Sequence, residues 1–316
     1  MGERYAVYRI SQEEGGRTVK SYLLNTLRLS GRCLIRLKLT DDGILLNGHR
    51  VTVRAMLQTG DTLSLALYDS KESPNIKPAP MSFEILYEDE DLVCINKPPH
   101  LPTHPSFGHS EDTVANGMAY LFAVRGEPFV FRCAGRLDRD TSGVLLLAKN
   151  QRTAGAIYRL HHERLVEKSY LALLEGIPVP AQGEIVSGIQ RKADSLVERE
   201  ISETGGAPAK TLYKLLGHAV TAEGLSVSAV LATPVTGRTH QLRVHFSSRG
   251  VPILGDTLYG KGSASGPIGR QALHAWRLRL PHPTKAEMLS LSAPIPEDMK
   301  ELCCLCGMSL DMLTDA

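Results

Sequence analysis

A carboxylate stands between two guanidinium groups directly before an apolar run. Arg136, Asp138 and Arg139 belong to the segment 135–143, and Val-Leu-Leu-Leu follows at 144–147. Because nearby cations favour the ionised form of a carboxyl group, we expect Asp138 to carry its charge at the mouth of a buried strand. Such a carboxylate can act as a nucleophile. Local sequence alone equally allows a salt-bridged turn without a catalytic role.

A second polar cluster, Thr-Gly-Arg-Thr-His-Gln-Leu-Arg-Val-His, interrupts the apolar pattern at 236–245. Thr239 can cap a helix that follows it, which puts Arg243 inside that helix between two aliphatic neighbours. A guanidinium near a core forms bidentate pairs with carboxylates, so Arg243 is expected to contact one. A zinc site is disfavoured because His240 and His245 lie five residues apart and share no helical face.

Lys168 and Tyr170 fall on one face of a strand predicted at 167–173, because side chains along a strand alternate with period two. The chain is poor in aromatic residues, which make up 5% of it. A tyrosine in such a place can stack on a nucleobase. A tyrosine in the core or at its rim is the other interpretation of the same pattern.

Taken together, these clusters resemble the sequence signatures of the RluA-type pseudouridine synthases. Residues 135–147 are similar to the R-L-D-x-x-T-S-G-L-L-L signature, and 236–260 are similar to T-G-R-T-H-Q-I-R-V-H…G-x-P-I-x-G-D…Y-G. Residues 168–170 resemble the K-x-Y strand of this family, and 96–105 resemble its N-K-P…H-P opening. The resemblance runs in order from about residue 87 to residue 283.

The resemblance implies an isomerase that detaches uracil from ribose, turns the base and reattaches it through carbon 5, without a metal or cofactor. It implies Asp138 as the catalytic carboxylate, Arg243 as its ionic partner, and Tyr170 as the residue that stacks on uracil and takes the final proton. Asp138 could attack the sugar, add to the base or assist elimination, and these alternatives stay open. Arg136 is expected to fill the space that the flipped uridine vacates, with a phosphate contact as the alternative. The other expected substrate contacts are Thr141, Lys168, His240 and Gln241.

Gly135 departs from the family pattern, in which a histidine commonly precedes the R-L-D triplet. Because that loop contacts the substrate, the departure bears on the identity of the target RNA rather than on the chemistry. Large-subunit ribosomal RNA is the favoured substrate, and tRNA is the alternative. Two other functions stay open: a non-catalytic RNA-binding or ribosome-assembly factor, and a base hydrolase that releases free uracil.

The chain has 316 residues and a net charge of +2, but the charge is unevenly distributed. Between Arg17 and Arg54, basic residues far outnumber the two acidic ones, Asp41 and Asp42. This segment resembles the small S-four-like RNA-binding module that often precedes this type of catalytic domain. Two helices, the second capped by Ser30, and a small hairpin sheet are predicted for it. Its expected RNA contacts are Arg28, Arg32, Arg36, Lys38 and Arg50.

Short strands dominate the rest of the chain and do not alternate strictly with helices, which favours an α+β fold with a mixed, largely antiparallel sheet. A proline-containing segment at 69–82 is interpreted as a linker. We therefore divide the chain into 1–78, the RNA-binding module with the start of the linker, 79–300, the catalytic domain, and 301–316, a C-terminal tail. Helices are expected over 112–123, 151–165 and 239–248. The expected strands are 44–46, 51–53, 63–67, 83–87, 92–96, 144–148, 169–174, 211–216, 225–232 and 273–280.

The six cysteines fit no disulfide pattern, because three lie singly in apolar segments and three lie near the C-terminal end. The three clustered thiols, at 303, 304 and 306, have no nearby histidine to complete a tetrahedral zinc site, and we expect them to be exposed or partly packed. No apolar run reaches the roughly 20 residues of a membrane span. The first 15 residues lack the apolar core of a signal peptide. These features indicate an unanchored, cytoplasmic protein, and the resemblance favours a monomer.

Overall fold

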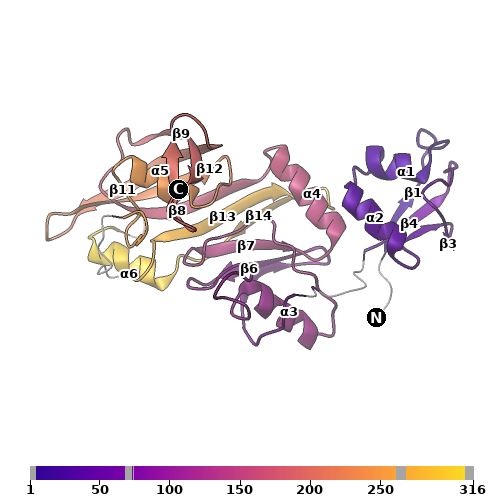
Figure 1. The fold of residues 1–316 in the computed structure, drawn as a ribbon, viewed down its shortest axis with the longest axis horizontal. Coiled ribbons are helices and arrows are strands. Elements are labelled where there is room, and N and C mark those ends of the chain that lie inside the picture. Colours follow the sequence, from indigo (N-terminus) through magenta and orange to yellow (C-terminus); the bar gives the residue numbers. More distant parts are fainter. Residues whose placement is uncertain (1–4, 68–72, 74, 261–267, 310–316) are drawn as a thin grey trace.

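The computed structural model describes residues 5–67, 73, 75–260 and 268–309, which form two sheets of very different size (Figure 1). The smaller sheet has four strands in the order β1-β4-β2-β3. The larger sheet has ten strands in the order β10-β9-β11-β12-β8-β13-β7-β6-β5, and β14 pairs with β13. The β13-β7 pair is parallel, and the other described pairs are antiparallel. The predicted α+β class with a mixed, largely antiparallel sheet is confirmed.

The small N-terminal module surrounds its own apolar core, which includes Leu23, Leu37 and Leu63. Ser30 caps the second helix by accepting a hydrogen bond from the Cys33 amide, as the sequence predicts. The first helix of this module, α1, continues directly as a π-helix, η1. The elements are β1 (Tyr5–Arg9), α1 (Val19–Ser21), η1 (Tyr22–Thr26), α2 (Gly31–Leu39), β2 (Ile44–Leu46), β3 (His49–Arg50) and β4 (Thr62–Ala66).

The strand predicted at 51–53 is wrong, because β3 ends at Arg50. Beyond that point the backbone serves the first helix instead of a sheet partner. The carbonyl oxygens of Val53 and Ala55 accept hydrogen bonds from the Lys20 and Val19 amides, which have no partner inside their own helix. Val53, at the end of the segment predicted as a strand, therefore pairs with the start of the first helix.

The larger module contains the rest of the described chain. Its first strands and helices are β5 (Glu84–Glu88), β6 (Leu92–Lys97), α3 (Val114–Val124), β7 (Ser142–Ala148), α4 (Gln151–His162) and β8 (Glu167–Glu175). Further along are β9 (Gln182–Arg191), β10 (Arg199–Ser202), β11 (Ala207–Val220), β12 (Ser226–Pro234), α5 (Gln241–Ser248), β13 (Leu273–Pro281), β14 (Met288–Ser292) and α6 (Glu297–Leu305). Strands β1, β9, β10 and β14 were not predicted, although the leucines of β14 alternate with serines and are buried.

Strand β7 is buried along its whole length because it has apolar packing on both faces. Leu145 and Leu147 belong to the core that also contains Phe122 of α3. Val144 and Leu146 belong to a second cluster with Ile157 of α4 and the apolar residues of β14. Figure 1 shows α4 on the side of the large sheet nearest the small module. The central position of β7 fixes the loop that precedes it.

Helix ends differ from the predicted ones where the backbone enters the left-handed region. Arg164 has φ of 59°, and α4 ends at His162 rather than at 165. His240 has φ of 57°, so α5 begins at Gln241, and the predicted cap by Thr239 is wrong. Thr113 caps α3 through a capping box, which places the start of that helix at Val114.

The predicted boundary between the catalytic domain and the tail, at 300/301, falls inside α6. Leu302, Cys303 and Cys306 pack into the main core, whereas Cys304 is exposed. Part of the expected tail therefore stabilises the large module, and residues 310–316 lie outside the described residues. Of the proposed linker, residues 69–72 and 74 lie outside them as well, so the domain division stays a prediction.

Candidate active site

A cavity of about 700 Å³ lies where the loop before β7, strand β8 and the segment leading into α5 meet. Asp138, Tyr170 and Arg243 line it together, although they come from three distant parts of the sequence. The sheet order β12-β8-β13-β7 brings the first two into register, since β13 pairs with both β7 and β8. The three residues predicted to carry out chemistry therefore share one site.

Gly143 explains how the loop of Asp138 can approach β13. Its φ is +111°, and a Cβ atom at this position would lie 2.2 Å from the carbonyl oxygen of Ala275. Only glycine tolerates both conditions. Beside it, the Ser142 hydroxyl lies 2.9 Å from Nδ1 of the buried His274. These contacts fix the start of β7 and, with it, the position of Asp138.

The guanidinium of Arg243 is buried and forms a bidentate ion pair with Asp256. Its Nε lies 2.7 Å from Oδ2 of Asp256, and its Nη2 lies 2.8 Å from Oδ1. The remaining nitrogen, Nη1, lies 3.5 Å from Oδ2 of Asp138. Burial opposes the charge of Arg243, but the hydrogen bonds and charge of Asp256 raise its pKa. The expected carboxylate contact of Arg243 is confirmed, with Asp256 as the closer partner.

Asp138 also faces His240. Its Oδ2 lies 4.0 Å from Nε2 of His240, and the side chain of Asp138 is 25% exposed to the cavity. Nδ1 of His240 lies 2.8 Å from the Tyr259 hydroxyl, which accepts a hydrogen bond from the Arg199 amide. Burial lowers the pKa of His240, which favours a neutral ring. The chain from β10 through Tyr259 thus orients His240 toward the carboxylate.

Tyr170 lies on β8 with 9% of its surface exposed, at the wall of the cavity. Burial and then the negative charge of Asp138 raise the pKa of its phenol. This position suits a ring that stacks on a base. The raised pKa weighs against the predicted role as proton acceptor, because the phenol stays protonated and a protonated phenol is a poor base.

Lys97 belongs to the N-K-P motif, and the sequence predicted no role for it. In the structure it is the main support of the loop that carries Asp138. Its ammonium is fully buried and donates hydrogen bonds to the carbonyl oxygens of Pro98, Leu101 and Arg139 at 2.7–2.8 Å. Burial lowers its pKa to about 7. Nothing in the sequence around this lysine indicated that it donates a hydrogen bond to a carbonyl group 42 residues away.

Two expected substrate contacts are used within the protein. Gln241 accepts hydrogen bonds from the Arg238 amide and the Thr236 hydroxyl, and its amide nitrogen donates to Lys210 and Thr211. All the hydrogen-bonding capacity of this side chain is thereby filled. Gln241 therefore positions the segment 236–241 instead of presenting polar atoms to a ligand.

Thr141 is also buried, and its hydroxyl accepts a hydrogen bond from Gln271 at 3.3 Å. Its amide donates to the carbonyl oxygen of Asp138, which closes the turn after the carboxylate. Arg136 and Lys168 line the cavity wall, as expected for substrate contacts, and Arg136 is exposed. All five expected contacts thus line the cavity, but Thr141 and Gln241 use their polar atoms to hold its loops.

Three of the expected RNA contacts of the small module are exposed to solvent. Arg32 and Lys38 lie on the outer face of α2. Arg50 lies on β3, where its Nη1 is 3.3 Å from Asp41. An exposed pair of this kind is weak and can be exchanged for a phosphate contact.

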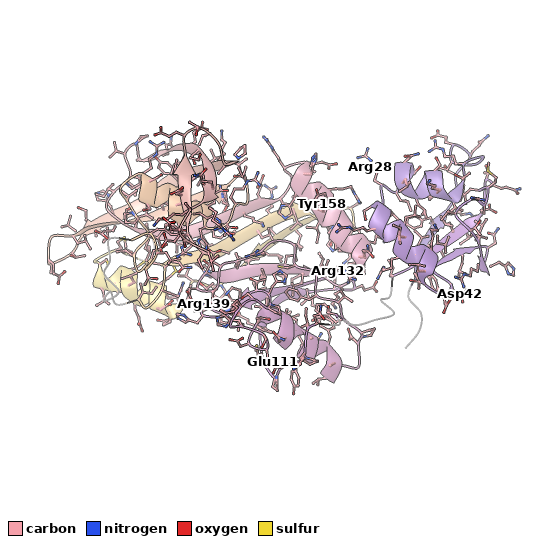
Figure 2. The ribbon with its side chains drawn as sticks, in the orientation of Figure 1. Arg28, Asp42, Glu111, Arg132, Arg139 and Tyr158 are labelled. Atoms are coloured by element: carbon pink, nitrogen blue, oxygen red, sulfur yellow. The ribbon has the colours of Figure 1, made fainter. Side chains whose placement is uncertain are left out.

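Arg28, which is exposed as well, and Arg36 turn toward the large module. Figure 2 shows Arg28 on the side of the small module that faces α4, and its carbonyl oxygen accepts a hydrogen bond from Arg159 of α4 at 2.9 Å. The Arg28 guanidinium lies 3.7 Å from Glu163. Burial and then the charge of Arg132 lower the pKa of Arg36. These two arginines therefore belong to the junction between the modules.

Two further properties concern the described part of the chain. No group of three or more His, Cys, Asp or Glu side chains there is arranged to hold a metal ion. None of the helices in that part combines the length and the apolar character that crossing a bilayer requires.

Comparisons with known proteins agree with this site. The model of a family described as RNA pseudouridylate synthase matches residues 91–248, which span β6 to α5. The RNA pseudouridine synthase YjbO of Bacillus subtilis is 35% identical over 90% of this chain and 98% of its own length. The ribosomal large subunit pseudouridine synthase D of Neisseria meningitidis is 32% identical over 91% of this chain and 78% of its own.

Among solved structures, human RNA pseudouridylate synthase domain containing 1 is similar to this chain. It is 33% identical, with a TM-score of 0.59, over 75% of this chain and 96% of the human one.

Proposed function

Since the chain belongs to the RNA pseudouridine synthase family, whose members are isomerases, we propose that it converts uridines of large-subunit ribosomal RNA to pseudouridine, with Asp138 as the catalytic carboxylate. One observation carries the role of Asp138. Its carboxylate is the acidic group that faces both Arg243 and His240 in the cavity, beside the ring of Tyr170. The printed name of the relative from N. meningitidis supports ribosomal RNA as the substrate.

The reaction requires the bond between carbon 1′ and nitrogen 1 to break and a bond between carbon 1′ and carbon 5 to form. The proton on carbon 5 is lost and nitrogen 1 gains one, so the product is an isomer of the substrate. Asp138 supplies the negative charge near carbon 1′, and the buried Arg243 keeps that carboxylate in place. Tyr170 holds the detached base by stacking while it turns.

The target uridine must leave its stack to reach this cavity, which costs a few kcal/mol. Arg136, exposed at the cavity wall, fills the vacated space. The small module, within the proposed boundaries 1–78, captures RNA through the exposed Arg32 and Lys38, and residues 79–300 carry the reaction. The protein acts as a monomer in the cytoplasm under this proposal, and tRNA is the alternative substrate.

The test is release of tritium from carbon 5 of labelled uridine in large-subunit ribosomal RNA. Asp138→Asn is expected to abolish release while the variant still binds RNA. Asp140→Asn is the matched control, because Asp140 lies on the same turn but contacts Arg139 and His100 outside the cavity. Turnover of Asp138→Asn near the wild-type rate would overturn the assignment.

The same assay separates the remaining alternatives. A non-catalytic RNA-binding protein would bind RNA and release no tritium. A base hydrolase would produce free uracil, whereas an isomerase leaves the mass of the RNA unchanged. Mapping carbodiimide-modified pseudouridines in ribosomal RNA and tRNA from a deletion strain identifies the target position.

A further inference from the structure

Lys168 presents an ammonium group to the cavity without an acidic partner. Its side chain comes from β8, two residues before Tyr170, and lines the same cavity wall as Gly135 and Arg136. Within the described chain, the Lys168 ammonium has neither a hydrogen bond nor an ion pair. Burial lowers its pKa, and the nearest titratable group that acts on it is the thiol of Cys133. A half-buried cation in this situation favours an anionic ligand.

In this structure the absence of a side chain at Gly135 leaves space for the end of Lys168. A Cβ atom built on Gly135 would lie 2.5 Å from Nζ of Lys168, and the next atom within reach is Cε of the same side chain, at 3.8 Å. Gly135 does not have the positive φ that would require glycine for conformational reasons. The position of the Lys168 ammonium is therefore what a side chain at residue 135 would disturb.

The surrounding wall carries mostly positive charge. Arg136, Arg164 and Arg238 line the cavity as well, against the acidic Asp138 and Glu167. A phosphodiester has one negative charge and several acceptor oxygens, which match an ammonium beside guanidinium groups. RNA supplies such a group at every nucleotide, whereas an uncharged base would leave the ammonium without a counter-charge.

The position of Lys168 points to a neighbouring nucleotide instead of the glycosidic bond. Nζ of Lys168 lies 2.5 Å from where a Cβ atom of Gly135 would be, three residues before Asp138 in the loop. Among the described residues, the charged groups paired with the Asp138 carboxylate are Arg243 and His240, and Lys168 is not one of them. The ammonium therefore lies at residue 135 of the loop and not at the Asp138 carboxylate.

We propose that Lys168 binds the RNA phosphate next to the target uridine, and that Gly135 keeps the space for its ammonium open. The proposal rests on the proposed function, because it takes the ligand to be RNA. Lys168 is a positioning residue here, since it holds the backbone while Asp138 acts on the sugar or base. The loop residue that departs from the family pattern and the lysine of the K-x-Y strand then form one functional unit.

The experiment measures binding and turnover of a large-subunit ribosomal RNA transcript by full-length variants. Lys168→Met removes the charge and keeps most of the stem, and its dissociation constant for RNA is expected to rise roughly 10- to 100-fold. The slope of log affinity against log salt is expected to become shallower by about 0.7–0.9, the value for one lost phosphate contact. The KM for RNA should rise more than kcat falls.

Gly135→Ala tests the space itself, because the added methyl group displaces the end of a flexible side chain and not the backbone. It is expected to weaken RNA binding as Lys168→Met does. The double variant is expected to be no weaker than Lys168→Met alone, since the two changes remove the same contact. Lys300→Met, on α6 and paired with Glu297, controls for the general loss of one positive charge.

Folding is checked by thermal unfolding, where Lys168→Met should not be less stable than wild type, because it removes a desolvated cation. If Gly135→Ala fails to fold, the salt slope of Lys168→Met decides alone. An unchanged dissociation constant and salt slope in Lys168→Met would overturn the proposal, as would a fall in kcat with an unchanged KM. A wild-type enzyme that binds RNA but releases no tritium refutes the proposed function instead.

Discussion

Asp256→Asn tests whether the buried ion pair, and not the contact with Asp138, holds Arg243 in the site. Both side chains are almost fully buried, at 6% exposure for Arg243 and 0% for Asp256. An asparagine keeps the shape but has no charge, and one of the two atoms that face the guanidinium becomes a donor. The buried cation then keeps one hydrogen bond to residue 256, the contact with Asp138 at 3.5 Å and the ring of Tyr259, but loses its full counter-charge.

The size of the effect follows from the burial of the pair. Removing one partner of a buried ion pair typically destabilises a protein by about 3–5 kcal/mol, because an uncompensated charge stays behind. For modules of this size, 1 kcal/mol corresponds to roughly 2–4 °C in the melting temperature, so we expect a fall of roughly 6–20 °C. Asp256 also accepts hydrogen bonds from the Leu258 and Tyr259 amides, which places the loss in the segment next to His240.

The assay compares urea unfolding and tritium release for Asp256→Asn and Asp138→Asn. Asp138 is 25% exposed, and its one contact with the guanidinium is long, at 3.5 Å. Its replacement should therefore change the free energy of unfolding by less than about 1 kcal/mol. The two variants are expected to lose different properties, one stability and the other activity. Asp256→Asn loses stability and retains partial activity, whereas Asp138→Asn keeps stability and loses activity. Equal destabilisation by both variants would refute the division of roles between the two carboxylates.

Three other predictions concern residues around the site and on the small module. Burial lowers the pKa of Lys97 from 10.5 to about 7, so the unfolded chain binds more protons between these values, and stability should rise with pH across this window. Urea unfolding from pH 7 to 10 checks this rise, of at most about 1.4 kcal/mol per pH unit, which Lys97→Met should lack. Tyr259→Phe leaves the Arg199 amide without its acceptor and should cost about 1–3 kcal/mol of stability and lower kcat. The double variant Arg32→Ala, Lys38→Ala should reduce the salt slope of RNA binding by up to about 1.8, if each residue contacts a phosphate.

Local patterns in the sequence predicted the parts of the fold that depend on neighbouring residues. The apolar run before residue 148 predicted β7, and Ser30 predicted the start of α2. The same reasoning missed β9 and β10, whose pairing with each other and with β11 sets their register. Sheet partners are chosen by tertiary packing, which period-two patterns do not encode.

The candidate site shows the same division between local and distant information. The types of Asp138, Tyr170 and Arg243 and the motifs around them were readable in the sequence, and the structure places all three in one cavity. The supports of the site were not assigned: Asp256 binds Arg243, and Lys97 binds the carbonyl oxygen of Arg139. Both contacts join distant chain segments through a buried charge, and the N-K-P and G-D motifs that contain these residues do not indicate their partners.

The contrast between the two carboxylates of Arg243 gives a physical reason for this arrangement. A catalytic carboxylate must be free to change its contacts as charge develops on the sugar, so it cannot also provide the main anchor of the group that stabilises it. Asp256 provides that anchor with two short hydrogen bonds, and one guanidinium nitrogen is left to face Asp138. Because the anchor is buried and Asp138 remains partly exposed, the position of the arginine is set before RNA binds. The conformational entropy of the Arg243 side chain is then lost when the protein folds, and not during the reaction.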